Sequence, residues 1–184
     1  LAVAPIDAFG GNAAEGLAAL ATHATRAQAL FVAARAPALR ILMPQREEAG
    51  LAALPVLATS QVQSGGDPRL DRELDGLQYP ELPWLLGDLV GPGDAESLGR
   101  RLPSARGSAA RLFAFGFDAW KVATYLDALR GGAQLRGATG ELGIDAAGIV
   151  ERVPAWAEYS GGVTRRASDG ALVPVDAPAP TTTP

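Results

Sequence analysis

Two short apolar segments in the first third of the chain constrain its fold more than any other feature. Residues 29–34 (ALFVAA) and 54–59 (LPVLAT) have the length of strands, and neither alternates polar with apolar residues. Unbroken apolar strands of this kind are typical of parallel sheets that are buried on both faces. We therefore expect both segments to be strands that are covered on both sides.

Helical patterns precede both segments. Apolar residues recur at helical spacing over 13–28, and a second helix is expected from Pro37 to just before Gly50, with Pro44 kinking or restarting it. The order helix, strand, helix, strand with short connections is typical of an α/β fold. The sequence thus predicts a parallel sheet flanked by helices.

Polar side chains follow the second apolar segment directly. Thr59, Ser60 and Gln61 come at its carboxyl end without an intervening helix. In open parallel sheets, ligand-binding groups collect beyond the carboxyl ends of the strands. We therefore predict that these three residues border a ligand-binding cleft.

The sequence contains few of the residue types and motifs that enzyme active sites use. It contains no cysteine and one histidine, His23, which excludes thiolate zinc sites, paired-histidine zinc sites and cysteine nucleophiles within these residues. It also has no phosphate-binding loop, no dinucleotide-binding glycine motif and no nucleophile elbow. An enzyme could use Ser60 or Asp118, but a serine nucleophile needs a base, and His23 lies in a predicted amphipathic helix. We predict a protein that is not an enzyme and has no cofactor or metal.

The remaining acidic side chains are expected to be solvated or structural. Asp71, Glu73 and Asp75 would not converge on a substrate in a strand or in a helix, so a solvated loop is expected. Asp118 is expected on the polar face of a long helix, and Asp145 in a turn between extended segments.

That long helix is predicted over 108–130, with Ser108 as its cap and Gly131 closing it. Its predicted buried residues are Leu112, Phe113, Trp120, Ala123 and Leu126.

The net charge of the chain argues against a nucleic-acid partner, and the lengths of its apolar runs argue against a membrane-spanning segment. The 184-residue chain has a net charge of −4, which argues against a nucleic-acid-binding surface because phosphate neutralisation needs a clustered basic face. The nearest basic cluster is expected to be a solvated helix face and consists of Arg100, Arg101, Arg106 and Arg111. No apolar run is long enough to predict a membrane span.

Four motifs together resemble one protein family. They are LPVLATSQVQSG, DRELDGLQYPELPWLL, RLFAFGFDAWKVATYLDAL and GATGELGIDAAGIVERVPAWAEYSGG. In order and spacing they resemble the C-terminal domain of the LppC/LpoA family, outer-membrane lipoproteins that activate penicillin-binding proteins. The resemblance runs from about Ala29 to Arg166.

The resemblance implies a periplasmic-binding-protein type I-like fold, in which two α/β lobes are joined by crossovers. It implies a first-lobe segment over 1–75, a crossover and helices of the other lobe over 76–136, and a return crossover with a β element over 137–170. One lobe is expected to be incomplete in this chain. Residues 171–184 are rich in Pro, Ala and Thr and are expected to form a disordered tail. Trp84, in the implied crossover, is expected to be core rather than an anchor for a partner.

For function, the resemblance implies a periplasmic regulator that binds and activates a class A penicillin-binding protein, a peptidoglycan synthase. It also implies anchorage to the outer membrane through a lipid outside this chain. The alternative, suggested by the predicted cleft at Thr59, Ser60 and Gln61, is a solute-binding module for an amino acid, a peptide or a cell-wall fragment.

Overall fold

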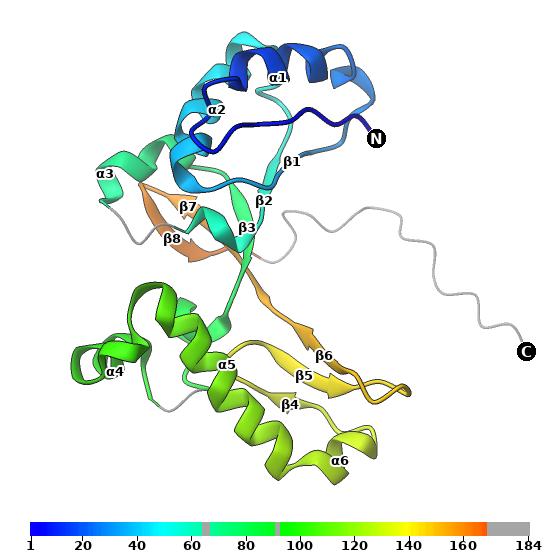
Figure 1. Ribbon diagram of the computed structural model, residues 1–184, viewed down its shortest axis with the longest axis vertical. Coiled ribbons are helices and arrows are strands. Elements are labelled where there is room, and N and C mark those ends of the chain that lie inside the picture. Colours follow the sequence, from blue (N-terminus) through cyan, green and yellow to red (C-terminus); the bar gives the residue numbers. More distant parts are fainter. Residues whose placement is uncertain (64–66, 91–92, 169–184) are drawn as a thin grey trace, which may run out of the picture.

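The computed structural model describes residues 1–63, 67–90 and 93–168, which form two bodies, each built on its own sheet (Figure 1). The first body contains a five-stranded sheet in the order β1-β2-β3-β7-β8, and the second a three-stranded sheet in the order β4-β5-β6. The predicted disordered tail, 171–184, lies outside the described residues.

The sheet of the first body is mixed. Strand β1 pairs with β2 and β2 with β3 in parallel, whereas β3 with β7 and β7 with β8 are antiparallel. The helices and strands of this body are α1 (Ala13–Ala21), η1 (Ala24–Arg26), β1 (Leu30–Val32), α2 (Ala36–Glu48), β2 (Val56–Ala58), η2 (Ser60–Val62), α3 (Pro68–Asp71), η3 (Arg72–Leu74), β3 (Gln78–Glu81), β7 (Ala155–Ser160) and β8 (Val163–Arg166). The predicted α/β class is confirmed.

One local prediction for this body is wrong, and a second is narrowed. Strand β1 is covered on one face only, because Leu30 and Val32 are buried while the Phe31 side chain between them is 64% exposed. Helix α2 runs through Pro44 as one element, so of the two predicted effects of this proline, a kink or a restart, the restart does not occur. Its apolar face, including Leu39 and Leu42, packs into the core that also contains the buried side of β1 and β2.

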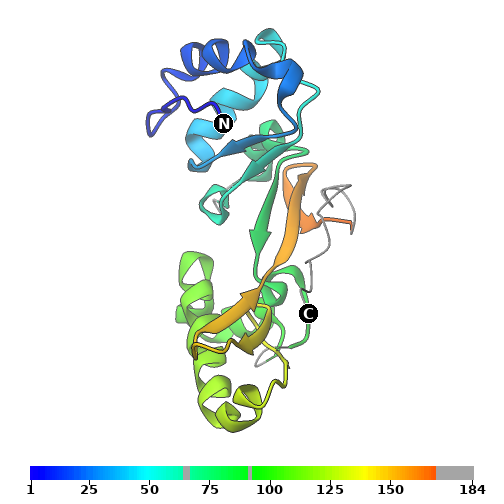
Figure 2. The same ribbon diagram turned by 90° about the vertical axis from the view of Figure 1, so that its right-hand side faces the viewer.

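The described part of the second body contains three α-helices and two short 3-10 helices beside the small sheet. Its elements are η4 (Pro83–Leu86), α4 (Ala95–Arg101), η5 (Pro103–Ala105), α5 (Gly107–Thr124), α6 (Leu126–Arg130), β4 (Leu135–Arg136), β5 (Glu141–Ile144) and β6 (Val150–Val153). The chain enters this body from β3 into η4 and returns from β6 into β7 (Figures 1 and 2). One cluster of its buried apolar residues consists of Leu82, Trp84, Ala105, Ala110, Ala114 and Ala138. Leu129 and Leu142 are fully buried as well.

Helix α5 turns a different face inward from the one that the sequence predicts. Leu112 and Trp120 are 75% and 63% exposed, and Ala123 is exposed too, whereas Ala110 and Ala114 are buried. Phe113, which was predicted to be buried, and Phe117 are partly buried and pack on the same core. The helix begins at Gly107, so Ser108 is not its cap, and it is interrupted before α6.

Candidate functional site

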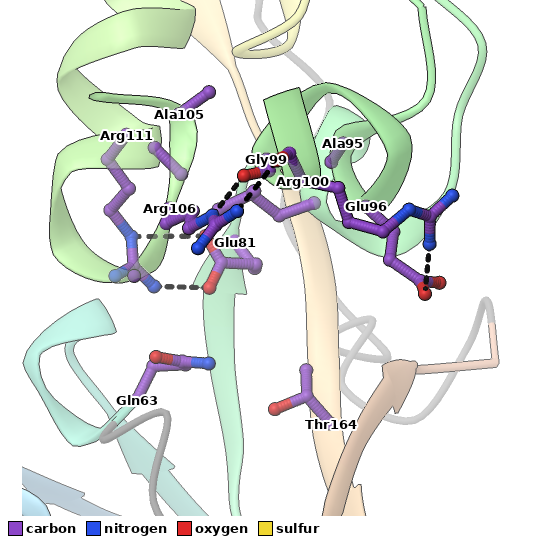
Figure 3. A pocket seen from close by; sticks show the side chains of 13 residues that line it. Gln63, Glu81, Ala95, Glu96, Gly99, Arg100, Ala105, Arg106, Arg111 and Thr164 are labelled. Atoms are coloured by element: carbon purple, nitrogen blue, oxygen red, sulfur yellow. Dashed lines mark hydrogen bonds and ion pairs between the residues drawn. The ribbon is translucent and has the colours of Figure 1, made fainter. Parts of the chain in front are cut away.

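A cavity of about 460 Å³ lies between the two bodies (Figure 3). Gln63 and Thr164 of the first body lie on its opposite side from Arg106 of the second. Thr164 is fixed by a 2.7 Å hydrogen bond between its Oγ1 and the hydroxyl of Tyr79. Burial raises the pKa of the Tyr79 phenol above its ordinary value, so this group stays protonated and neutral.

An ion pair in the wall of the cavity joins the end of β3 to the first turns of α5. Arg111 donates through Nε and Nη2 to the two carboxylate oxygens of Glu81, with 3.2 Å between Nε and Oε1. The Glu81 side chain is 2% exposed, and its Oε1 also accepts the Leu82 backbone N–H at 2.8 Å. Because the two charges neutralise each other, the pair links the bodies and leaves no free carboxylate for acid or base chemistry.

The other arginines of the cavity are also engaged. Arg106 donates to the carbonyl oxygens of Gly99 and Arg100, the latter at 2.8 Å. At the rim, Arg100 pairs with Glu96 at 2.8 Å, but both side chains are largely exposed and the pair adds little stability. The four arginines predicted to form one solvated face therefore do not act as one surface, since Arg111 belongs to a buried pair.

The predicted cleft residues Thr59, Ser60 and Gln61 come shortly before a residue that lines this cavity. Thr59 precedes η2, in which Ser60 and Gln61 are the first two residues, and Gln63 immediately after η2 lines the cavity. Thr59 Oγ1 is buried and has no hydrogen-bond partner within the described part of the chain, whereas Gln61 is exposed. None of the three lines the cavity as described, and their role in ligand binding stays a prediction.

Asp118 is the most completely satisfied polar side chain of the second body. Its carboxylate accepts hydrogen bonds from the backbone N–H of Ala138 at 2.8 Å, the backbone N–H of Thr139 at 2.8 Å and the Thr139 hydroxyl at 2.6 Å. Arg152 in turn donates to Thr139 Oγ1 at 2.6 Å. A Cβ at Gly137 would collide with the Asp118 carboxylate, so glycine is required for the close approach.

The prediction that Asp118 lies on a polar face is wrong, because the residue is fully buried. Its three donors hold α5 against the loop before β5, which gives the GATGELGID motif a structural role. A carboxylate with all its partners in place is poorly suited to proton transfer, and this argues against Asp118 as a catalytic base. The only signal in the sequence was an acidic residue between apolar ones.

Of two further predictions from the sequence, the one for Asp71 is wrong and the one for Trp84 is confirmed. Asp71 is not in a solvated loop: it is buried, and Arg40 of α2 donates to its Oδ1 at 2.6 Å. Trp84 is core, as predicted, because its side chain is fully buried and its ring centroid lies 5.7 Å from that of Phe113. Its Nε1 donates to the carbonyl oxygen of Gly93 at 2.7 Å.

Residues 1–63, 67–90 and 93–168 offer few other groups that could bind a metal ion or take part in catalysis. No cluster of three or more His, Asp or Glu side chains in these ranges could hold a metal ion. His23 is exposed, beyond the end of α1, and its Nδ1 lies 3.5 Å from a guanidinium nitrogen of Arg26. Among the helices described, none combines the length and the apolar character needed to cross a membrane.

Comparison with protein families settles which family this architecture represents. A family model described as "LppC putative lipoprotein" matches residues 6–162. The chain belongs to the LppC family. The predicted family membership is therefore confirmed.

Curated relatives of this LppC-family chain are named penicillin-binding protein activators. The protein named "Penicillin-binding protein activator LpoA" from Enterobacter sp. (strain 638) is 33% identical over 126 residues, which cover 66% of this chain and 16% of that protein. The relative with the same name from Klebsiella pneumoniae is 34% identical over 108 residues, covering 56% and 14%. The chain thus spans less than a fifth of the length of these relatives.

Solved structures agree on the fold of this LppC-family chain. The LpoA (YraM) C-domain from Haemophilus influenzae, described as a regulator of PBP1A, matches with a TM-score of 0.67 and 22% identity over 83% of this chain and 49% of that one. The leucine-binding protein LivK from Thermotoga maritima matches with a TM-score of 0.50 and 17% identity over 81% and 47%. The predicted periplasmic-binding-protein-like fold is confirmed.

Proposed function

We propose that this chain is part of a non-enzymatic periplasmic regulator that binds and activates a class A penicillin-binding protein during cell-wall synthesis. The observation that carries the proposal is the similarity to proteins named penicillin-binding protein activators, at 33% identity over 66% of the chain. Membership of a lipoprotein family supports anchorage to the outer membrane through a lipid outside these residues.

The polar groups of the structure support a regulatory role rather than catalysis. The buried or partly buried charged side chains that could act in catalysis are Glu81, Arg111 and Asp118. Each is hydrogen-bonded or ion-paired within the protein. Such pairing stabilises geometry at the expense of reactivity, because a catalytic acid or base needs a proton that can be transferred. The Glu81–Arg111 pair instead joins β3 to α5, and Asp118 holds α5 against the loop before β5.

Binding to a purified class A penicillin-binding protein from the same organism tests the proposal. Biolayer interferometry would compare the 184-residue chain with the longest natural form of the protein, alongside a transpeptidase assay of the synthase. We expect saturable binding and faster transpeptidation with the longest form. If that form neither binds nor stimulates any class A synthase of the organism, the proposal is wrong.

The cavity between the bodies favours a second candidate function, solute binding. Its position between two α/β bodies and its mixed lining, with Gln63, Thr164 and Arg106, would suit a small polar ligand such as an amino acid, a peptide or a wall fragment. These compounds can be tested in a thermal-shift screen. A true ligand at saturating concentration should raise the melting temperature of the protein by several degrees. No shift with any of them would leave regulation as the better explanation.

A further inference from the structure

The cavity between the two bodies carries one positive charge that no described carboxylate balances. Its charged lining residues are three arginines and two glutamates, which sum to +1 on a chain whose net charge is −4. Arg111 is paired with Glu81, and at the rim Arg100 is paired with Glu96. None of the ion pairs in the described part of the chain includes Arg106. The unbalanced charge therefore belongs to Arg106.

Arg106 is oriented by neutral groups. Its Nε donates to the carbonyl oxygen of Gly99, and its Nη2 donates to that of Arg100 at 2.8 Å. Both acceptors are backbone groups of α4, so they fix the guanidinium without cancelling its charge. Its Nη1 takes part in neither bond, and a guanidinium nitrogen can only donate. This nitrogen can therefore donate to an acceptor of a bound ligand.

The wall of the cavity opposite Arg106 is polar but uncharged (Figure 3). Gln63 presents a side-chain amide there, which can both donate and accept hydrogen bonds. Thr164 presents a hydroxyl that is bonded to the Tyr79 hydroxyl at 2.7 Å. A ligand that spans the cavity would meet a cation on the second body and neutral polar groups on the first.

The carboxylates that line the cavity are poorly placed to bind an ammonium group. Both oxygens of Glu81 accept from Arg111, and Oε1 also accepts the Leu82 backbone N–H. Glu96 lies at the rim, where its side chain is 87% exposed and paired with Arg100. A free amino acid would bring a carboxylate and an ammonium, and only the carboxylate would find an unpaired partner of opposite charge. Removing the ammonium from water without a partner is costly.

Volume and charge limit the ligand further. The cavity of about 460 Å³ lies within the range of small-molecule sites, roughly 300–1,000 Å³. One arginine balances one negative charge, whereas a phosphate monoester brings roughly −1.5 to −2 at neutral pH. The oxygens of a carboxylate also match the planar fork of a guanidinium. A single carboxylate is the group that fits best.

We propose that the cavity between the bodies binds a small ligand with one carboxylate and no ammonium group, and that Arg106 holds the carboxylate. Gln63 and Thr164 would contact the neutral remainder of the ligand from the first body. The inference rests on the second candidate function, solute binding, and names the chemical class of the solute. A peptide with a blocked amino end belongs to this class, whereas a free amino acid does not.

Calorimetric titration of the longest natural form of the protein with matched peptides tests this inference. The probes are N-acetylated dipeptides of alanine, serine and leucine with a free carboxyl end. Each is compared with its C-terminal amide and with the same dipeptide carrying a free amino end. We expect an acetylated acid to bind at least about tenfold more tightly than both relatives, because the amide lacks the charge and the free dipeptide adds an unpaired one.

Two variants connect this selectivity to the cavity. Arg106→Gln should weaken binding of the acetylated acid at least about tenfold and leave binding of the amide unchanged. Arg101→Gln, at an exposed arginine of α4 that does not line the cavity, is the matched control and should bind like the unaltered protein. Because Arg106 also contacts the backbone of α4, Gln63→Glu is the second variant. It adds a negative charge to the opposite wall and should weaken binding of the acid while every contact of Arg106 stays in place.

Three results would overturn the inference. If the dipeptide with a free amino end binds as tightly as the acetylated acid, the ligand class is wrong but solute binding stands. If Arg106→Gln and Gln63→Glu bind the acid like the Arg101→Gln control, the carboxylate is held elsewhere. If no acetylated acid binds, the cavity does not select this class, and the thermal-shift screen of amino acids and wall fragments decides separately whether the protein binds a solute.

Discussion

The two bodies are stabilised in different ways. The first has a continuous apolar core of Leu, Val and Tyr side chains between its sheet and α2, with Leu39, Leu77 and Tyr79 fully buried. In the second, alanines surround Trp84 in one cluster, Leu129 and Leu142 are also fully buried, and the Asp118 hydrogen bonds join α5 to the loop before β5. The first body therefore depends mainly on a large apolar core, and the second combines a smaller set of buried apolar side chains with a buried carboxylate.

This difference shows how the same chain can use its helices for different purposes. In α2 the apolar side faces the core and the helix is fixed by burial. In α5 the inner side combines small residues, the partly buried Phe113 and Phe117, and charges with partners inside the protein, whereas Leu112 and Trp120 remain outside. The five substitutions that follow test this comparison, from the largest expected effect to the smallest.

Among the five substitutions, Trp84→Ala should cause the largest loss of stability, and the loss falls on the second body. The side chain is fully buried, so we expect the free energy of unfolding to fall by about 3–5 kcal/mol through lost burial and the cavity that remains. Urea denaturation followed by circular dichroism measures the change. Trp120→Ala, at an exposed tryptophan of α5, should change stability far less, and equal effects of the two substitutions would contradict the assignment of Trp84 to the core.

Leu39→Ala tests the apolar core of the first body. Leu39 is fully buried in α2, and removing its side chain should cost about 2–5 kcal/mol. The loss should be nearly the same at low and high salt, because no charge is involved. Ile41→Ala, at a partly exposed position of the same helix, is the control. A cost below about 1 kcal/mol for Leu39 would mean that packing on α2 is looser than described.

Asp118→Ala should destabilise the second body selectively. It leaves the N–H groups of Ala138 and Thr139 buried without their acceptor, at a cost of about 2–3 kcal/mol. Hydrogen exchange should accelerate in α5 and β5 while β2 stays protected. Asp127→Ala, at an exposed acidic residue of α6, should have little effect. Uniform acceleration in both bodies would show that they unfold as one unit.

Asp88→Asn tests the exposed contact between the bodies. Asp88 pairs with Arg166 of β8 at 2.5 Å and with Arg136 of β4 at 3.7 Å. Since both arginines are substantially exposed, the loss should stay below about 1 kcal/mol and should vanish at high salt. Thermal unfolding at low and high salt measures it. A larger, salt-independent loss would mean that this pair contributes more than an exposed contact.

The smallest effect is expected at Asp94, the N-terminal cap of α4. The Ser97 backbone N–H donates to Asp94 Oδ1 at 2.7 Å, and with the Ser97 side chain it lowers the pKa of Asp94 below the usual aspartate value. Because the pKa is lower in the folded state, the stabilisation is present above the unfolded pKa and is lost as pH falls through the folded pKa. NMR titration of the carboxyl carbon should show this lowered pKa. An ordinary value would disprove the cap, and Asp94→Asn should remove the pH dependence of α4.

Much of the fold could be predicted from the sequence, because short apolar runs and helical periodicity report local burial. The strands at 30–32 and 56–58 and the helix at 36–48 follow directly from these patterns. The family could be predicted too, since four motifs keep their order. For the site, the end of the strand led to the prediction of Thr59, Ser60 and Gln61, which stays a prediction; the cavity is lined by Gln63, two residues beyond Gln61.

The tertiary structure alone decided which side of each element faces inward. A pattern of apolar residues on two sides of a helix does not state which side is covered, so the inner face of α5 and the exposed face of β1 were assigned wrongly. Likewise, Glu81 and Asp118 look like ordinary surface acids in the sequence. Only the contacts with Arg111 and with the loop before β5 show that they are buried, because a charge becomes tolerable inside a protein through partners that are distant in sequence.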